Sequence, residues 1–232
     1  MHTVVFGDVH IPNQNNKAVK ILFEHIKKNN PDRIIINGDL LDMWELSSFD
    51  RAPKGGKTFS EEIHLAQSFL GELSRLSEAQ ITYIEGNHSF RLRKYLLTQA
   101  PELYDLDVLD IDNLLGLDDL DIEYVAIPDE CSKFQDNYVM DQNFYVGHFN
   151  AVRGASGATA KQLVDKYGVN IIQAHVHRGG VYYKRLITGE ILTGIEGYCM
   201  CDLNPSYMRN CNWQAGWVDI VDEEPILHHI PC

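Results

Sequence analysis

The sequence is short of basic residues. It has 20 Lys and Arg residues against 33 Asp and Glu residues, which gives a formal net charge of −13. A protein that binds nucleic acid along an extended surface does so through many Lys and Arg side chains, so this balance argues against such a surface. An anionic ligand that is held locally, for example by metal ions, is still compatible with the sequence.

Cysteines and long apolar runs are also scarce. Five cysteines, an odd number that stand toward the C-terminal part, do not indicate a disulfide framework, and we interpret them as reduced thiols. A zinc site built from Cys199, Cys201 and Cys211 is the less favoured interpretation, because they lack clear ligand-pair spacing. No run approaches the roughly 20 apolar residues that cross a bilayer, and no basic segment precedes an apolar one at the start. We therefore expect a cytoplasmic protein without membrane contact.

The length and composition favour one folded α/β domain. With 232 residues, of which 44% are hydrophobic, the chain can bury a sizeable core, and no stretch rich in Pro, Gly or Ser divides it. Short apolar runs alternate with amphipathic stretches, which is typical of βαβ units. We expect a single domain over residues 1–232.

The predicted elements can be given by their residue ranges. In the first half we expect strands at 3–6, 33–36 and 81–84, a helix at about 16–28, a second helix that opens at Ser60 and extends to Leu73, and a surface loop at 47–59. After residue 120 we expect strands at 122–127, 144–146, 171–172, 181–187 and 191–195, a helix at 159–167, and a closing hairpin of 216–221 with 225–230.

Polar residues that can bind metals follow five of these apolar runs. They are Asp8 and His10, then Asp39 and Asp42, then Asn87 and His88, then His148, and last His175 and His177. Ligands in open α/β sheets gather outside the carboxyl ends of the strands, so these segments are predicted to converge. The other histidines, which are His2, His25, His64, His228 and His229, are interpreted as surface or hydrogen-bonded residues.

The residue types indicate the kind of ligand. Carboxylate, imidazole and amide donors without thiolate favour Mn, Fe, Zn or a similar divalent ion. Seven of these residues are counted as metal ligands, namely Asp8, His10, Asp39, Asn87, His148, His175 and His177. Seven ligands are too many for one open metal, so two metals that share a carboxylate fit better. Residues two apart in an extended segment point to the same face, which would direct the Asp8/His10 and His175/His177 pairs to a common centre.

At these residues the sequence resembles the calcineurin-like metallophosphoesterases. Their motifs Asp-x-His, Gly-Asp-x-x-Asp, Gly-Asn-His, a later His and Gly-His-x-His occur here in order from Asp8 to His177, with Ala174 in place of the last Gly. The resemblance implies a four-layer α/β/β/α sandwich of two mixed sheets. It points to one of the small stand-alone members found in bacteria and their viruses.

The resemblance also implies roles. One metal would be held by Asp8, His10, Asp39 and His177, and the other by Asp39, Asn87, His148 and His175, with Asp39 as the bridge. His88 and Asp42 match the acid-and-orienting pair of the family, although Asp42 could instead be a carboxylate at a helix start. The implied reaction is in-line attack of a metal-bridging hydroxide on a phosphate ester. Mn is the expected metal, with Fe, Zn or Ni as alternatives.

The substrate is less constrained. Arg91 and Arg153 lie nearest the motifs and are candidates for binding phosphate oxygens, against the alternative of solvated surface residues. Met43, Trp44 and Ser89 stand where protein Ser/Thr phosphatases have other residues, so that subclass is disfavoured. We expect a phosphodiesterase acting on a nucleotide or a nucleic-acid end. The alternatives are a phosphomonoesterase on a nucleotide or small phosphate ester, and a non-catalytic scaffold with the same fold; the sequence leaves the oligomeric state open.

Overall fold

A computed structural model describes residues 1–47, 57–128, 133–205 and 211–231. The strands of the first sheet are β1 (His2–Phe6), β2 (Arg33–Asn37), β3 (Gln80–Ile84), β4 (Ile122–Val125), β10 (Ala215–Val221) and β11 (Glu224–Ile230). The strands of the second sheet are β5 (Tyr138–Asp141), β6 (Phe144–Gly147), β7 (Ile171–Gln173), β8 (Gly179–Arg185) and β9 (Ile191–Gly197).

Both sheets mix parallel and antiparallel pairing. The first has the order β11-β10-β1-β2-β3-β4, in which β1 to β4 are parallel and β10 and β11 pair antiparallel. The second has the order β5-β6-β7-β9-β8, with parallel pairing of β6, β7 and β9 and antiparallel strands at the two edges. The parallel pairing brings the carboxyl ends of β1, β2 and β3 to one edge of the first sheet.

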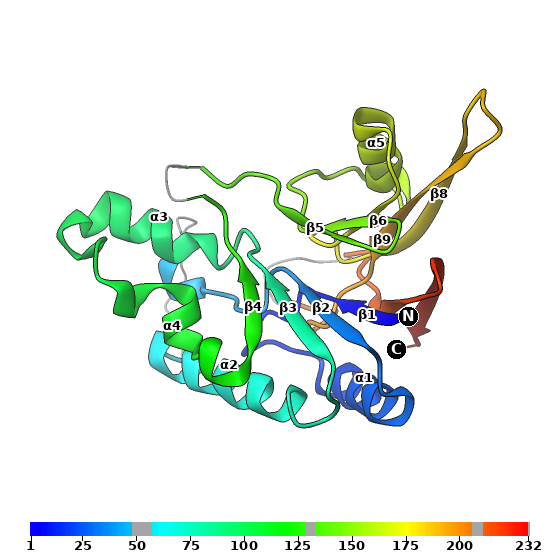
Figure 1. Cartoon of the computed structure of the whole chain (residues 1–232). Helices are drawn as coiled ribbons and strands as arrows, with labels where there is room; N and C mark the ends of the chain where they lie inside the picture. Colours follow the sequence, from blue (N-terminus) through cyan, green and yellow to red (C-terminus); the bar gives the residue numbers. More distant parts are fainter. Residues whose placement is uncertain (48–56, 129–132, 206–210, 232) are drawn as a thin grey trace.

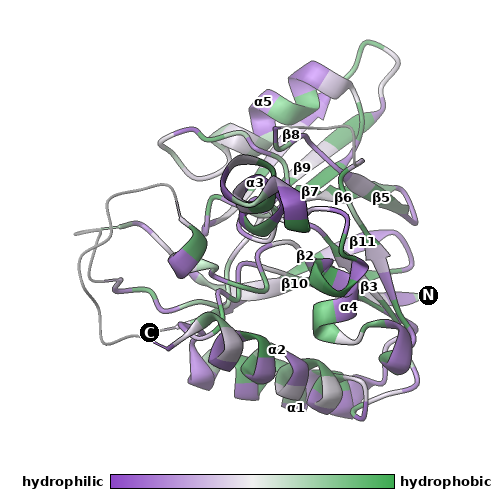
Figure 2. Cartoon of the chain, turned by 90° about the vertical axis from the view of Figure 1, so that its left-hand side faces the viewer, coloured by the Kyte–Doolittle hydropathy of each residue, from purple (hydrophilic) through white to green (hydrophobic). Residues whose placement is uncertain are grey.

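Helices cover the outer faces of the two sheets (Figure 1). They are α1 (Asn16–Asn29), α2 (Phe59–Leu73), α3 (Phe90–Gln99), α4 (Ile111–Leu115) and α5 (Ala158–Tyr167), with the 3-10 helices η1 (Trp44–Leu46), η2 (Pro101–Leu103), η3 (Asp107–Leu109) and η4 (Asp118–Leu120). α1 and α2 lie side by side on the first sheet, and Figure 2 shows the alternation of polar and apolar residues along them. α5 packs on β7, β8 and β9. The predicted four-layer α/β/β/α sandwich of mixed sheets is confirmed.

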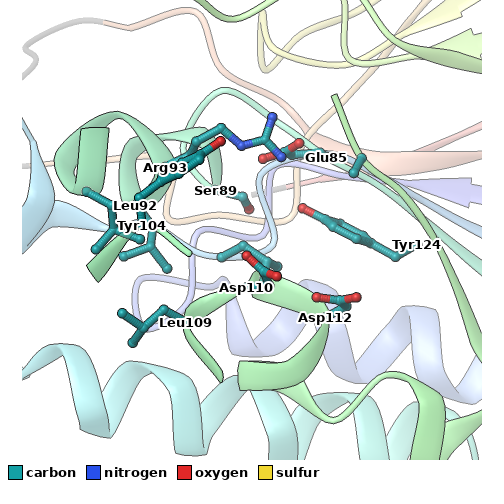
Figure 3. A pocket seen from close by; sticks show the side chains of 12 residues that line it. Glu85, Ser89, Leu92, Arg93, Tyr104, Leu109, Asp110, Asp112 and Tyr124 are labelled. Atoms are coloured by element: carbon teal, nitrogen blue, oxygen red, sulfur yellow. The ribbon is translucent and has the colours of Figure 1, made fainter. Parts of the chain in front are cut away.

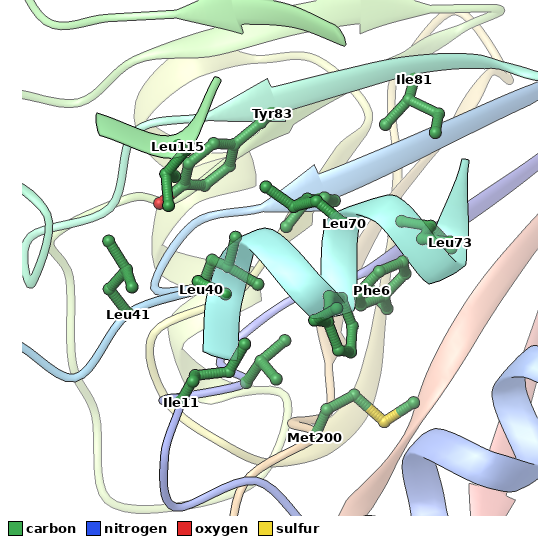
Figure 4. Packing of buried hydrophobic residues seen from close by; sticks show 14 of the residues in the cluster. Phe6, Ile11, Leu40, Leu41, Leu70, Leu73, Ile81, Tyr83, Leu115 and Met200 are labelled. Atoms are coloured by element: carbon green, nitrogen blue, oxygen red, sulfur yellow. The ribbon is translucent and has the colours of Figure 1, made fainter. Parts of the chain in front are cut away.

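Two apolar clusters hold the layers together. Val5, Ile35 and Ile84 of the first sheet meet Val146 and Ile195 of the second, all of them buried. On the other face of the first sheet, side chains of β1 and β3 pack against those of α2 and of the segments around them (Figure 4). Burial of apolar area is the main force that fixes such layers, and strands buried on both faces explain the continuous apolar runs of the sequence.

The structure corrects some element boundaries. Thr58, not Ser60, caps α2: its hydroxyl accepts a hydrogen bond from the backbone N–H of Glu61, and the Glu61 carboxylate accepts one from the backbone N–H of Thr58. The predicted loop therefore ends before Phe59, and its residues 48–56 lie outside the described part. β5 and the short helices between residues 100 and 121 were not predicted. None of the helices in the described ranges is both long and apolar enough to span a membrane.

Candidate metal centre

Strand ends of both sheets supply the candidate ligands. β1, β2 and β3 lead into Asp8 and His10, into Asp39, and into Asn87, while β6 and β7 of the facing sheet lead into His148 and into His175 and His177. Five of these side chains are buried: those of Asp8, His10, Asp39, His148 and His177. The structure thus brings all seven predicted metal-binding residues to one place between the two sheets.

The backbone that positions these ligands is left-handed rather than extended. Asp8, His10, Asp39, His175 and His177 have φ angles of 51°, 51°, 42°, 73° and 57°. The expectation that each Asp-x-His or His-x-His pair lies on an extended segment is therefore wrong, although both pairs do converge. Non-glycine residues in this region are uncommon and cost free energy, and they cluster at functional sites.

Two glycines of the motifs are required by close packing. Gly38 has a φ of 79°, and a Cβ atom added to it would lie 2.1 Å from Nδ1 of His148. A Cβ atom on Gly86 would lie 2.2 Å from the backbone nitrogen of Asp39. Only glycine lets these chain segments approach so closely. Ala174, by contrast, is accommodated as a buried residue without a left-handed backbone.

Asp8, His10 and His177 form the first group of donor atoms. Their ligand atoms all lie within 4.8 Å of one another. Nε2 of His177 lies 3.4 Å from Oδ1 of Asp8 and 3.1 Å from Nε2 of His10. Oδ1 of Asp8 is buried and has no hydrogen-bond partner in the described structure. A bare carboxylate oxygen among imidazole nitrogens is an unfavourable arrangement that a bound cation would stabilise.

Asp39, His148 and His175 form the second group, and their ligand atoms also lie within 4.8 Å of one another. Oδ1 of Asn87 is 3.0 Å from Nε2 of His148, so the amide joins this group. Oδ2 of Asp39 lies 3.3 Å from Nε2 of His148 and 3.8 Å from Nε2 of His10. Asp39 therefore stands between the two groups, where a shared ligand is needed. This donor chemistry fits two divalent cations.

Hydrogen bonds from the surrounding chain orient the donors. Nδ1 of His148 donates to the carbonyl oxygen of Asn37, 3.2 Å away, which turns Nε2 toward the site. The backbone N–H groups of His88 and His175 donate to Oδ1 of Asp39 and Oδ2 of Asp8, each at 2.8 Å. Each carboxylate thus keeps its other oxygen directed at the histidines.

Buried charge shifts the pKa values of these groups. Burial opposes ionisation of Asp39, but His148 and His88 hold the pKa of this carboxyl well below its usual range. Burial likewise opposes charge on His148, yet Asp39 and Asp8 raise its pKa to about 9. Burial and the neighbouring His148 lower the pKa of His175 to about 4. A protonated His148 therefore balances the carboxylates in the metal-free protein, and cations would replace that proton.

His88 and Asp42 form a hydrogen-bonded pair beside the donor groups. Nδ1 of His88 is 2.8 Å from the carbonyl oxygen of Asp42 and 3.2 Å from its Oδ1. Asp42 does not cap a helix, because the residue before η1 is Met43. Oδ2 of Asp42 accepts from the side chain of Asn13 at 2.8 Å. Asn13, which lies just after the first motif, was not predicted as a site residue, because no motif includes it.

The two candidate substrate arginines are placed differently. Arg91 donates to the carbonyl oxygen of Asp42 at 2.8 Å and lies 2.9 Å from Nε2 of His88, so its guanidinium is at the site. Arg153 is exposed, and its guanidinium donates to the adjacent carbonyl of Val152. The next residue after the last motif, Arg178, is buried and donates to the backbone of Arg153 and Gly154.

The C-terminal cysteines lie at two separate positions. Cys199 and Cys201 are buried beside His177, and their sulfur atoms group with its ring, with 3.7 Å between Sγ of Cys201 and Nδ1 of His177. Cys211 instead donates to the carbonyl oxygen of Leu203. Cys131 and Cys232 lie outside the described residues. Trp213 packs edge-on against the His177 ring, with 4.2 Å between ring centroids.

A separate pocket is lined by residues of α3, of the segment before α4 and of β4, and by Glu85 and Ser89 on either side of the Gly86-Asn87-His88 segment (Figure 3). It has a volume of about 190 Å³ and is bordered by Glu85, Arg93, Asp112 and Tyr124 among others. None of the seven candidate metal ligands lines it. Oε2 of Glu85 accepts from the backbone of Ile127 and Arg93 donates to the carbonyl of the same residue, so these charges hold the chain after β4.

The fold is that of an α/β protein with two mixed sheets and outer helices. Oxygen and nitrogen donors gather at the strand ends, where they form a candidate two-metal centre. The model of the calcineurin-like phosphoesterase family matches residues 1–179. This match covers more than half of the chain, and the chain belongs to that family.

The chain is also similar to curated proteins and, more remotely, to solved structures. The Gene 54 proteins of Mycobacterium phages L5 and D29 are 27% and 28% identical over 228 residues, which cover 92% of this chain and 86% of each relative. Vps29 of Chaetomium thermophilum superposes with a TM-score of 0.46 at 9% identity, over 99% of this chain and 97% of that one. YfcE, a phosphoesterase from E. coli, gives 0.43 at 11% identity, over 96% and 89%. Both structural likenesses are remote.

Proposed function

We propose that the chain is a phosphoesterase that needs two divalent cations and cleaves a phosphodiester. The observation that carries this proposal is the pair of donor groups that share Asp39. One group has Asp8, His10 and His177, and the other has Asn87, His148 and His175. A purely structural role would not require two buried carboxylates to face five such donors, because the buried charges are costly unless a cation compensates them.

Manganese is the proposed metal, since mixed carboxylate, amide and imidazole donors suit it; Fe, Zn and Ni are the alternatives. When bound, a metal pair of this kind supplies Lewis-acid activation of the phosphate and of the attacking water. The chain itself contributes the fixed carboxylates, the neutral imidazoles and the hydrogen bonds that orient them. The close contacts made by Gly38 and Gly86 keep the two donor groups together.

His88 is proposed to supply the proton for the leaving group. Its Nδ1 is held by Asp42, and its Nε2 faces the site at 3.9 Å from Oδ2 of Asp39. Asp42 would hold the ring in place, and Nε2, when it carries a proton, would pass that proton to the departing oxygen. Arg91, which contacts Nε2 here, would turn to a phosphate oxygen when substrate binds.

A diester is favoured over a monoester on grounds of charge. A diester carries one negative charge, which the single guanidinium of Arg91 beside His88 can match. Arg153 remains a candidate for a second contact only if its exposed side chain leaves Val152. The net charge of −13 favours a small substrate, such as a nucleotide, or a nucleic-acid end reached locally.

We also propose that residues 1–232 form one domain, since one apolar cluster joins both sheets. We further propose that this domain acts in the cytoplasm.

The test compares hydrolysis of bis(p-nitrophenyl) phosphate and p-nitrophenyl phosphate with Mn²⁺. We expect the wild-type protein to cleave the diester faster, and His88→Ala to lower its kcat by ~10²–10⁴-fold. His64→Ala, on the exposed face of α2, is the matched control and should keep the wild-type rate. A faster monoester reaction would support the phosphomonoesterase alternative. Equal, negligible turnover by wild type and His88→Ala would contradict catalysis and support a scaffold.

A further inference from the structure

A second cluster of possible metal ligands lies at the other end of β1 from the candidate centre. β1 begins at His2, and its far end leads to Asp8. Four elements each contribute one side chain to this cluster: His2 from β1, His25 from α1, Asp219 from β10 and His228 from β11. Asp219 and His228 lie beyond residue 179, where the family match ends.

Three imidazole nitrogens converge on one carboxylate oxygen. Oδ2 of Asp219 lies 2.8 Å from Nε2 of His25, 3.0 Å from Nε2 of His228 and 3.3 Å from Nε2 of His2. The ligand atoms of His2, His25 and Asp219 all lie within 4.8 Å of one another. Strand pairing explains the convergence, because Val4 pairs with Asp219 and Trp217 with His228, which puts His2 and His228 diagonally next to Asp219.

Hydrogen bonding alone leaves this cluster incomplete. His25 and His228 are well placed to donate to Asp219, and Nε1 of Trp217 donates to its Oδ1 at 3.1 Å. Nε2 of His2 is buried and has no hydrogen-bond partner among the described residues, although it lies near Oδ2. A buried ring nitrogen that lies near this oxygen without a hydrogen bond to it would be satisfied by coordination to a shared cation.

We propose that His2, His25, Asp219 and His228 bind one zinc ion that links β1, α1 and the β10–β11 hairpin. Three imidazoles and one carboxylate are a zinc donor set, and four protein ligands make a closed, structural site. Bond lengths of about 2.0–2.1 Å in a tetrahedron place ligand atoms about 3.3 Å apart. The contact of His2 with Oδ2 of Asp219 already has this separation, and those of His25 and His228 need to lengthen by a few tenths of an ångström. Nε2 of His228 does not belong to the group of atoms within 4.8 Å of one another, so this ring must also move toward His2 and His25 when the ion binds.

The surrounding residues fit this role. Trp217 holds Oδ1 of Asp219 and leaves Oδ2 for the ion, and its ring stacks on His228 with 4.6 Å between centroids. Burial opposes ionisation of Asp219, but the hydrogen bond from His25 and the nearby histidines lower the pKa of this carboxyl. Nδ1 of His25 lies 3.1 Å from the side-chain amide nitrogen of Asn29, which also donates to the carbonyl oxygen of His25. A zinc-bound His25 carries its proton on Nδ1, so the Asn29 amide must move away from this atom when the ion binds.

Trp217 provides a readout that is separate from the candidate catalytic centre. The chain has three tryptophans, so Trp44→Phe with Trp213→Phe leaves Trp217 alone. Co²⁺, a paramagnetic substitute for zinc, should quench its fluorescence in a saturable way, and Zn²⁺ should reverse the effect. In this background His25→Gln should weaken the response by at least ~100-fold. His229→Gln, an exposed neighbour on β11, is the control and should respond like the parent.

Metal counting after gel filtration gives the second measurement. The His25→Gln chain should carry one zinc ion fewer than the His229→Gln chain, whether or not either hydrolyses a phosphate ester. If circular dichroism shows that His25→Gln does not fold, His228→Gln at the more open side of the cluster takes its place. An unquenched Trp217 in the parent, or equal zinc content in ligand and control variants, overturns the proposal.

Discussion

Five of the seven candidate ligands have a left-handed backbone. Each such residue costs on the order of 1 kcal/mol or more relative to an ordinary conformation. The surrounding structure maintains them through hydrogen bonds to backbone groups of His88 and His175 and through the close packing around Gly38 and Gly86. At the scale of single residues, tight turns after the strands therefore determine where the ligands lie. The glycines that allow close packing are as necessary for this geometry as the ligands themselves.

Gly38→Ala tests this packing. The added Cβ atom would overlap the ring of His148 and the φ of 79° is unfavourable for alanine, so His148 must move. We expect loss of at least one bound Mn²⁺ per chain and a lower midpoint of thermal unfolding, by several degrees. Gly154→Ala is the control, because its added Cβ would meet nothing within 4 Å. Unchanged metal content in Gly38→Ala would show that the His148 position is not tightly fixed.

At the scale of elements, α2 supports the segment that follows β2. Oε1 of Glu62 on α2 accepts the backbone N–H of Met43 at 2.7 Å, and Met43 itself has a φ of 50°. This contact holds the chain just beyond Asp42, the partner of His88. Burial raises the pKa of Glu62 to about 7, and the charge of Asp42 adds to that effect. The buried carboxyl of Glu62 thus fixes the loop that contains Asp42, the partner of the proposed proton donor His88.

Glu62→Gln should change how stability depends on pH in the metal-free protein. A carboxyl whose pKa is about 7 when folded and 4.5 when unfolded makes the free energy of unfolding fall as pH rises between those values. Glutamine keeps an oxygen for Met43 but has no charge. Between pH 5 and 8 the variant should gain roughly 2 kcal/mol relative to wild type in urea unfolding. Glu72→Gln, exposed on the same helix, should show no such gain, and a pH-independent difference for Glu62→Gln would contradict the account.

Elements with strong local signals could be predicted from the sequence, and others could not. Buried strands such as β2 and β3 are continuous apolar runs, and the polar residues after them marked the site. β5 is a half-exposed edge strand whose pattern is weak, and α4 depends on burying Ile111 and Leu115 against the main core rather than on its own five residues. The left-handed turns were not predicted, because they result from the close approach of chain segments in the fold. The alternation of residues along an extended segment, on which the prediction rested, carries no information about them.

Clusters of side chains from distant parts of the chain were also not predictable from the sequence. His2, His25 and His228 are each isolated in the sequence, and a lone histidine is usually an ordinary surface or hydrogen-bonded residue. Only the pairing of β1 with β10 and of β10 with β11 brings them to Asp219. Asn13 and Trp213 reach Asp42 and His177 in the same way, through tertiary contacts that no short motif encodes.

At the scale of the whole molecule, a negatively charged protein can still bind a negatively charged phosphate ester, because the binding site is confined to one place. The chain has a formal net charge of −13, yet Asp8 and Asp39 are buried at the edge where the two sheets meet. Two divalent cations there would make the site locally positive while the exterior stays acidic. This arrangement favours a small anionic ester over a long nucleic acid. The proposed zinc site at the other end of β1 would act on the fold and not on this chemistry.

The most direct test of the central claim is anomalous diffraction from crystals of the full chain grown with Mn²⁺. We expect two manganese peaks about 3.5–4 Å apart, one on each side of Asp39, with one near Asp8, His10 and His177 and the other near Asn87, His148 and His175. A single peak at this place, or manganese bound elsewhere with none beside Asp39, would contradict a two-metal centre.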